Sequence, residues 1–259
     1  MTAPKISFSE LKVWNECPFK HKLVYIDEID KFKGNEYTAF GTAIHAVCEG
    51  KVLNESLQER DLFISSFDEE MNKLKELDID VDDSLVESMK NQGLSLCEFA
   101  IPELKNYFGD FKVLAVEEPL MEDINHFESY GKKFKGFIDL IIQTEDEKIH
   151  IIDWKTCTWG WDMKKRSDPM TTYQLTYYKN FYAQKHNIDP KKIETYFILL
   201  KRTAKKNQAE VVRITSGPRK TNNSLKLLEN AVYNIEKQNF VKNRLSCKYC
   251  MFKNTTHCP

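Results

Sequence analysis

Residues 136–156 read GFIDLIIQTEDEKIHIIDWKT, and this stretch decides the fold. Two isoleucine-rich runs flank a short acidic turn at residues 144–147, which is the pattern of a β-hairpin. The first run carries Asp139, the second carries Asp153, and Lys155 follows two positions later. Charged side chains are almost never fully buried unless they are paired or bind a metal ion. The charges of this hairpin therefore need an explanation.

The side chains of a strand alternate between its two faces, so Asp153 and Lys155 point the same way and Trp154 points the other way. Both faces of the second run are largely apolar, as in a central strand that is covered on two sides. A hairpin places the end of its second strand near the start of its first, and Asp139 lies toward that start. We therefore expect the two carboxylates to converge.

Two interpretations of the three charges remain open at this point. In the first, Lys155 forms a buried salt bridge with one acid, and the other acid still needs a partner. In the second, Asp139 and Asp153 form a hard oxygen site for Mg²⁺ or Mn²⁺. Lys155 then holds an attacking water or helps to deprotonate it. These are the groups that metal-dependent phosphodiester hydrolysis requires.

The composition allows a sizeable core without pointing to a ligand. The chain has 259 residues, of which 41% are hydrophobic and 30% charged, and a formal net charge of -1. No global basic field marks a nucleic-acid-binding protein, although local patches can still bind DNA. Such clusters occur at residues 201–202, 205–206 and 219–220, and at Lys164, Lys165 and Arg166. They are either solvated loops and helix ends or the approach to a DNA site.

Several classes of protein are excluded by what the sequence lacks. No apolar run approaches the ~20 residues of a membrane-spanning helix, and residues 1–14 lack the apolar stretch of a signal peptide. We therefore expect a cytoplasmic protein with reduced thiols. No GxxxxGK[ST] motif occurs, so we expect no P-loop ATPase. The many Lys and Asn residues would fit an AT-rich bacterial or phage genome.

Periodicity predicts an α/β fold in which helices flank a mixed central sheet. The first hundred residues favour helices, beginning with one that Ser7 or Ser9 caps and that carries Leu11 to Leu23. The predicted strands cover residues 111–120, 134–143, 148–156, 193–202 and 209–215. Further helices are predicted over 82–108, 170–187 and 220–238. This divides the chain into a helical region (1–110), a core (111–240) and a cysteine-rich tail (241–259).

The hairpin resembles a known family. Asp139, followed by a turn and then by Asp153-Trp154-Lys155, is similar to the signature of the PD-(D/E)XK nucleases. Gly136-x-x-Asp139 resembles the form of that motif in the RecB-like members. The resemblance implies a restriction-endonuclease-like core over residues 111–240. It also implies that Asp139, Asp153 and the carbonyl of Trp154 bind Mg²⁺ or Mn²⁺ and that Lys155 is catalytic.

Gln174 and Tyr178 lie in the helix predicted after the hairpin and share one of its faces at i and i+4. They are either an ordinary polar pair or, by resemblance, the Gln-x-x-x-Tyr motif of RecB-like nucleases, which contacts the nucleic acid. His45 is, on its own, most simply a core histidine. The resemblance makes it a ligand of the catalytic metal. Glu117 is a further candidate whose alternative is a surface acid at a strand end.

The chain has seven cysteines. Cys48, Cys97 and Cys157 lie in apolar or mixed segments, and we expect them to fill core space. The other four form a pattern in which one cysteine near the N-terminus is joined by Cys-x2-Cys-x7-Cys in the tail. These are Cys17, Cys247, Cys250 and Cys258. Four thiolates suit an iron–sulfur cluster or a tetrahedral zinc ion.

The cysteine pattern resembles the iron–sulfur subgroup of RecB-like nucleases, which includes AddB and the CRISPR-associated exonucleases of the adaptation module. This resemblance implies a [4Fe–4S] cluster, with structural Zn²⁺ as the alternative. The last gap of seven residues is longer than that of the family, and His257 could compete with Cys258 as a ligand. Either metal would tie Cys17 to the tail and so restrict the unfolded chain.

Taken together, the motifs predict a metal-dependent DNA exonuclease that prefers single-stranded ends, in DNA recombination, repair or replication. Asp139, Asp153 and Lys155 would be its catalytic residues. Gln174 and Tyr178, with the basic segments 164–166 and 201–206, would bind the substrate. The alternative is a non-catalytic DNA-binding or scaffold subunit of a recombination or CRISPR-adaptation complex. In either case a helicase, an annealing protein or an integrase is the expected partner, and no membrane is involved.

Overall fold

A six-stranded mixed sheet forms the centre of the structure, a computed structural model that describes residues 4–29 and 32–259. Its strands are β1 (Lys5–Ser7), β2 (Phe111–Asp123), β3 (Lys133–Thr144), β4 (Ile149–Cys157), β5 (Ile193–Lys201) and β6 (Ala209–Ile214). β3 pairs with β1 in parallel and with β2 and β4 in antiparallel, β4 pairs with β5 in parallel, and β5 pairs with β6 in antiparallel. The prediction of an α/β fold with a mixed central sheet is confirmed.

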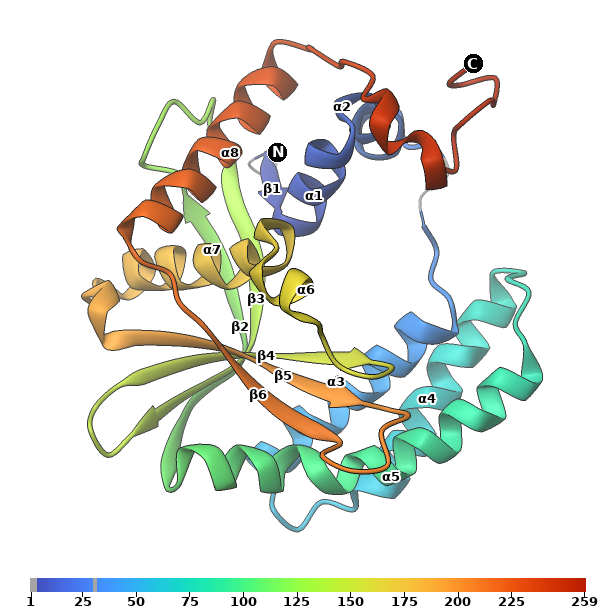
Figure 1. Ribbon diagram of the computed structural model, residues 1–259, viewed down its shortest axis with the longest axis vertical. Coiled ribbons are helices and arrows are strands. Elements are labelled where there is room, and N and C mark those ends of the chain that lie inside the picture. Colours follow the sequence, from blue (N-terminus) through green and yellow to red (C-terminus); the bar gives the residue numbers. More distant parts are fainter. Residues whose placement is uncertain (1–3, 30–31) are drawn as a thin grey trace.

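Helices cover both faces of this sheet (Figure 1). They are α1 (Phe8–Glu16), α2 (Pro18–His21), α3 (Glu36–Leu53), α4 (Glu59–Glu76), α5 (Asp83–Phe108), α6 (Met163–Ser167), α7 (Pro169–His186) and α8 (Pro218–Glu236). Short turns of other helix types are η1 (Lys22–Ile26), η2 (Pro190–Lys192) and η3 (Arg244–Tyr249). In the described part of the chain, no helix is both long and apolar enough to cross a membrane.

Each face of the sheet has its own hydrophobic core. On one face, α1, α7 and α8 pack on the strands, and Phe134 of β3 stacks on Phe181 of α7 with ring centroids 4.3 Å apart. On the other face, α3, α4 and α5 enclose Phe63 and Phe67, whose rings also stack. Trp154 of β4 is completely buried in this second core. The two cores fix the sheet from both sides and so position the residues at its centre.

The N-terminal region differs from its predicted single helix. The helix is interrupted at Cys17, whose backbone is extended (φ -162°, ψ 113°), and the chain continues as α2 and the π-helix η1. Pro18 explains the break, because a proline disfavours the helical conformation in the residue before it. The region predicted to be helical also contributes the strand β1. The short helix α6 was not predicted either.

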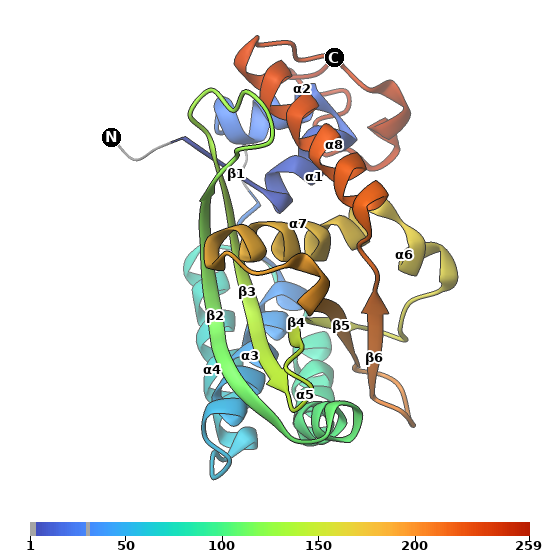
Figure 2. The ribbon, with the colours of Figure 1, turned by 90° about the vertical axis from the view of Figure 1, so that its left-hand side faces the viewer.

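The hairpin of β3 and β4 is open at one end. Long β2 pairs along one edge of β3 over its whole length (Figure 2). The other edge of β3 is shared between two strands, because β1 pairs with it as far as Lys135 and β4 pairs with it only from Leu140 onward. No strand in the described ranges pairs with that edge over residues 136–139. The end of β4 meanwhile pairs with β5, so the sheet splits there.

Candidate active site

The split in the sheet brings the two predicted acids together. Asp139 lies just before the last pair of the hairpin, Leu140 with Ile152, and Asp153 lies just after it. Trp154 has no β3 partner here, and its N–H instead donates to Oδ2 of Asp139 at 2.8 Å. Asp153 is fully buried and Asp139 is 7% exposed. The convergence expected from the hairpin is therefore present in the structure.

His45 reaches the two acids from the face of the sheet that α3, α4 and α5 cover. It lies on α3, whose start is fixed by a capping box between Asn35 and Thr38. Its Nε2 donates to the carbonyl of Trp154 at 3.0 Å, and its Nδ1 lies 3.4 Å from Oδ2 of Asp139. The imidazole therefore contacts both the backbone and the carboxylate that the split exposes.

Asp153 is contacted from two elements. Lys155 Nζ forms an ion pair with its Oδ2 at 2.5 Å. Gln174 of α7 donates from Nε2 to Oδ1 of Asp153 at 2.8 Å and lies 3.1 Å from the hydroxyl of Tyr178. The glutamine and tyrosine motif predicted on α7 thus faces the carboxylates.

Gly136 lets Tyr178 approach the open edge of β3. An added Cβ at Gly136 would lie 2.8 Å from Cε1 of the Tyr178 ring, so the ring occupies the space of a side chain. The backbone N–H of Phe137 hydrogen-bonds to the Tyr178 hydroxyl. Burial raises the pKa of that hydroxyl, so it stays protonated. Tyr178 therefore satisfies a strand edge that has no neighbouring strand.

Burial and mutual charge set the protonation of the site. Burial, followed by the charge of Asp153, raises the pKa of Asp139 well above its usual range. Burial opposes the charge on Lys155, but Asp153 and Asp139 outweigh it and raise the pKa of the ammonium group. Burial lowers the pKa of His45 in spite of the nearby acids. A bound cation would stabilise the ionised forms of these two closely spaced acids, and a neutral imidazole is able to bind a metal ion.

The donor set fits a hard divalent cation. Oδ2 of Asp153 is buried, and the charged ammonium of Lys155 lies against it. Within residues 4–29 and 32–259, no three His, Cys, Asp or Glu side chains are grouped closely enough to hold a metal ion. Mg²⁺ does not require three, because it retains several waters and is held by one or two carboxylates. Asp139 and Asp153 would supply these, with Trp154 O and His45 beside them.

A second pair of acids lies next to the site. Glu49 follows His45 by one helical turn on α3 and is hydrogen-bonded to Glu117, which has a positive φ of 50° on β2. Burial and the charge of Glu117 raise the pKa of Glu49 to about 8. Glu117 also contributes to the raised pKa of Asp139. Glu49 was missed by sequence analysis, although its i+4 spacing from His45 would have indicated it.

The side chains of the predicted basic segments are of two kinds: some are paired with an acid, and others are exposed to solvent. Arg166 is paired with Glu210 at 2.7 Å and also donates to Trp161 O, and Lys201 lies 3.4 Å from the same glutamate. Lys164 and Lys165 are exposed on α6, directly before α7, and Lys165 lies over the ring of Trp161. Of these segments, the exposed lysines are the better candidates for phosphate contacts.

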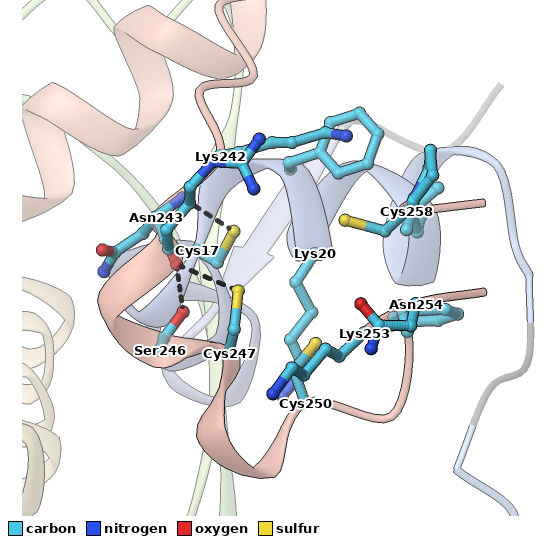
Figure 3. A pocket seen from close by; sticks show the side chains of 15 residues that line it. Cys17, Lys20, Lys242, Asn243, Ser246, Cys247, Cys250, Lys253, Asn254 and Cys258 are labelled. Carbon is cyan, nitrogen blue, oxygen red and sulfur yellow. Dashed lines mark hydrogen bonds between the residues drawn. The ribbon is translucent and has the colours of Figure 1, made fainter. Parts of the chain in front are cut away.

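The four cysteines of the N-terminus and the tail line one cavity of about 260 Å³ (Figure 3). The tail is attached to the N-terminal helices, because Phe19 N donates to Val241 O at 3.3 Å and Asn243 Nδ2 donates to Glu16 O at 2.9 Å. The backbone N–H of Asn243 also donates to Sγ of Cys17 at 3.3 Å. His257, the predicted competing ligand, is not among the residues that line this cavity.

Positive side chains surround the cysteines. Lys20, Lys242, Arg244 and Lys253 all line the cavity. Four thiolates carry negative charge, which these cations and the N–H donor to Cys17 would offset. By contrast, Cys48 and Cys97 are buried in the second core, and burial raises the pKa of both thiols. Core filling, as predicted, accounts for these two.

A central mixed sheet with an acid on one strand, an acid and a lysine on the next, and a glutamine facing them defines a restriction-endonuclease-like nuclease core. The chain belongs to the PD-(D/E)XK nuclease superfamily, whose family model matches residues 5–257. The predicted superfamily is thereby confirmed. Membership of its RecB-like iron–sulfur subgroup stays a prediction. No curated protein matches the sequence.

One solved structure supports the fold. The chain is similar to a protein from Eubacterium rectale described as a "Putative exonuclease", with a TM-score of 0.60 and 12% identity over 95% of this chain and 86% of the other. A second match is the protein designated SSO0001, with a TM-score of 0.38 and 17% identity over 91% of both chains. At its low identity, the first match establishes the shared fold alone.

Proposed function

We propose that this chain is a Mg²⁺- or Mn²⁺-dependent deoxyribonuclease, an exonuclease that acts on single-stranded DNA ends. The observation that carries the proposal is the split between β3 and β4. At the split, Asp139, Asp153 and Lys155 meet around the fully buried carboxylate of Asp153, whose Oδ2 is paired with the Lys155 ammonium group. The exonuclease role and the single-strand preference follow the resemblance to RecB-like nucleases.

Each residue of the site has a separate task in this proposal. Asp139, Asp153 and the Trp154 carbonyl hold the cation, and His45 contributes its Nδ1. When bound, the ion polarises the phosphoryl group and lowers the pKa of a water molecule. Lys155, held protonated by Asp153, orients the attacking water and stabilises the charge that develops on the phosphate. Gln174 fixes the Asp153 carboxylate and, with Tyr178, contacts the substrate strand.

The decisive assay uses end-labelled single- and double-stranded DNA with Mn²⁺, with Mg²⁺ and with EDTA. We expect metal-dependent release of nucleotides from single-stranded ends and a loss of about 10³-fold in Lys155→Ala. The position of the label gives the polarity. A wild-type protein that binds DNA but cleaves none of these substrates would favour the non-catalytic scaffold subunit instead.

We further propose that Cys17, Cys247, Cys250 and Cys258 bind a [4Fe–4S] cluster, with Zn²⁺ as the alternative. The shared cavity and the positive side chains that line it support this proposal. Within residues 4–29 and 32–259 the thiols are not grouped closely enough to hold a metal ion, so binding would have to draw them together. Anaerobically purified protein should contain iron and acid-labile sulfide and should absorb visible light. A colourless protein that contains one zinc ion per chain would identify the alternative, and one without either metal would contradict both.

The proposed nuclease function also suggests a biological setting. We propose a cytoplasmic protein of DNA recombination, repair or replication, since reduced cysteines suit such a compartment. The exonuclease would need a helicase, an annealing protein or an integrase as partner to supply single-stranded ends. A pull-down from the source cells would identify which of the three it is. Recovery of DNA without any of them would contradict the need for a partner.

A further inference from the structure

A cavity of about 620 Å³ adjoins the carboxylate site along the open edge of β3. Asp139, Gln174 and Tyr178 form part of its lining, so it is continuous with the site. Its remaining walls come from β1, the first turn of α1, η1 and the beginning of β3. A pocket of this size is in the range that accommodates small organic ligands. It lies where a strand leaving the scissile phosphate has room to continue.

Phe137 and Lys135 line this cavity from β3 itself. They stand two and four positions before Asp139, and alternation places them on one face of the strand. Phe137 is 45% exposed, although the next five residues of β3 are buried. Nζ of Lys135 lies 5.4 Å from the centroid of the Phe137 ring. An accessible aromatic face therefore lies between a cation and the catalytic carboxylate.

The charges of the cavity are balanced. Lys5 and Lys135 line it together with Glu10 and Glu28, and Glu10 is bonded to His21 Nε2 at 2.9 Å. A groove that bound only phosphates would carry an excess of cations. This lining instead suits a nucleotide, because a base takes the aromatic surface and one phosphate takes a lysine. Base stacking on aromatic side chains is how proteins bind single strands without reading their sequence.

We propose that an unpaired base next to the scissile phosphate stacks on Phe137 while Lys135 contacts the adjoining phosphate, so that this cavity selects single-stranded DNA. The inference rests on the proposed nuclease function and gives its strand preference a physical cause. A base in a duplex is stacked between its neighbours and cannot present its face to Phe137. Duplex ends must therefore be unpaired before they enter the cavity.

The test is direct binding, measured by fluorescence anisotropy with fluorescein-labelled oligothymidylate and with a labelled duplex, in EDTA to prevent cleavage. Phe137→Ala should weaken binding of the single strand by roughly 5- to 100-fold, the range of one lost base stack, and leave duplex binding unchanged. Phe137→Trp should restore it. Lys135→Gln should lower the slope of log affinity against log salt by about one phosphate contact, which Phe137→Ala should not.

Phe99→Ala is the matched control, because Phe99 on α5 is also exposed (42%) but lines a cavity that contains none of the residues of the carboxylate site. The proposal is wrong if Phe137→Ala binds single strands as Phe99→Ala does, or weakens both substrates equally. Cleavage separates this inference from the proposed function. If the wild-type protein cuts DNA and Phe137→Ala binds single strands normally, the proposed role of the cavity is wrong and the proposed nuclease function stands. If the binding results are as expected but the wild-type protein cuts no DNA, the proposed nuclease function is wrong and the role of the cavity stands.

Discussion

The carboxylate site and the cysteine cavity are built in different ways. The carboxylate site is centred on one hairpin, with side chains from α3 and α7, and its members are already joined by hydrogen bonds and an ion pair at 2.5–3.1 Å. The cysteine cavity joins segments far apart in the sequence, since Cys17 and Asn243 are 226 positions apart. Its four thiols line a common space but are not grouped closely enough, within the described residues, to hold a metal ion. The first site is organised by the fold. The second, if it binds metal, helps to organise the fold.

This difference predicts where each site is vulnerable. A site organised by the fold can lose activity through one substitution and keep its shape. A site that closes a long loop should lose stability first, because the closure restricts the unfolded chain. The free energy of unfolding therefore separates the two regions better than activity does.

The largest effect should come from opening the cysteine cavity. We expect Cys247→Ser, or removal of the metal by an anaerobic chelator, to lower the free energy of unfolding by up to about 5 kcal/mol, the closure entropy of a loop of this length. Urea unfolding of protein with and without its metal measures this difference. Proteolysis should then cut first near η1 and the tail.

Cys157→Ser is the control for this prediction, since Cys157 is half-buried on β4 and outside the cavity. If Cys247→Ser and Cys157→Ser unfold at the same urea concentration, and the chelator changes neither, the tail is held by its backbone contacts alone. The comparison between the two regions would then fail.

A smaller effect should come from the ion pair of the hairpin. Lys155→Ala leaves the fully buried Asp153 without its cation, which we expect to cost about 3 kcal/mol of folding free energy in protein without Mg²⁺ or Mn²⁺. The double variant Asp153→Asn, Lys155→Met removes both charges and should recover most of that stability while it stays inactive. Urea unfolding of the single and the double variant measures this difference.

Equal stability of the single and the double variant would show that Asp153 does not depend on Lys155 in the folded chain. Added Mg²⁺ or Mn²⁺ sharpens the result. An ion that binds the folded protein only should raise the stability of the wild type in proportion to its occupancy, and Asp153→Asn should weaken that response.

The sequence predicted the hairpin and its charges because both depend on local order. Alternation along β4 placed Asp153 and Lys155 on one face, and the helical period of α7 placed Gln174 and Tyr178 together. These relations hold wherever the elements form. They explain why the sheet, its main strands and the approach of Asp139 to Asp153 across the hairpin were foreseeable from the sequence alone, although the split itself was not.

Relations between distant segments could not be foreseen in the same way. β1 consists of three residues and exists because Lys133 to Lys135 offer it an edge of β3. The split beside Asp139 depends on where β4 turns toward β5, which no local pattern records. The Glu49–Glu117 pair likewise joins α3 to β2. Such features appear only once tertiary packing has selected one arrangement.

The smallest effect concerns Glu49. It tests whether the arrangement that the fold imposes on the carboxylate site extends to the neighbouring pair of Glu49 and Glu117. Its pKa is raised from the usual 4.5 to about 8, by burial first and by Glu117 second. Between these pH values the folded chain keeps a proton that the unfolded chain releases. The folded state therefore loses stability as pH rises through this window. Glu49→Gln keeps a hydrogen-bond donor but cannot titrate, so it should remove this loss.

We expect Glu49→Gln to match the wild type near pH 5 and to exceed it by about 1 kcal/mol at pH 8, a value kept low because solvent screens a half-buried acid. Urea unfolding at both pH values measures the difference, and Glu76→Gln on the exposed face of α4 is the control. A Glu49→Gln protein with the pH slope of the wild type would show that the pair carries no shared proton. Of the acids around the site, Asp139 alone would then have a pKa that the fold raises, and the arrangement that the fold imposes would end at His45.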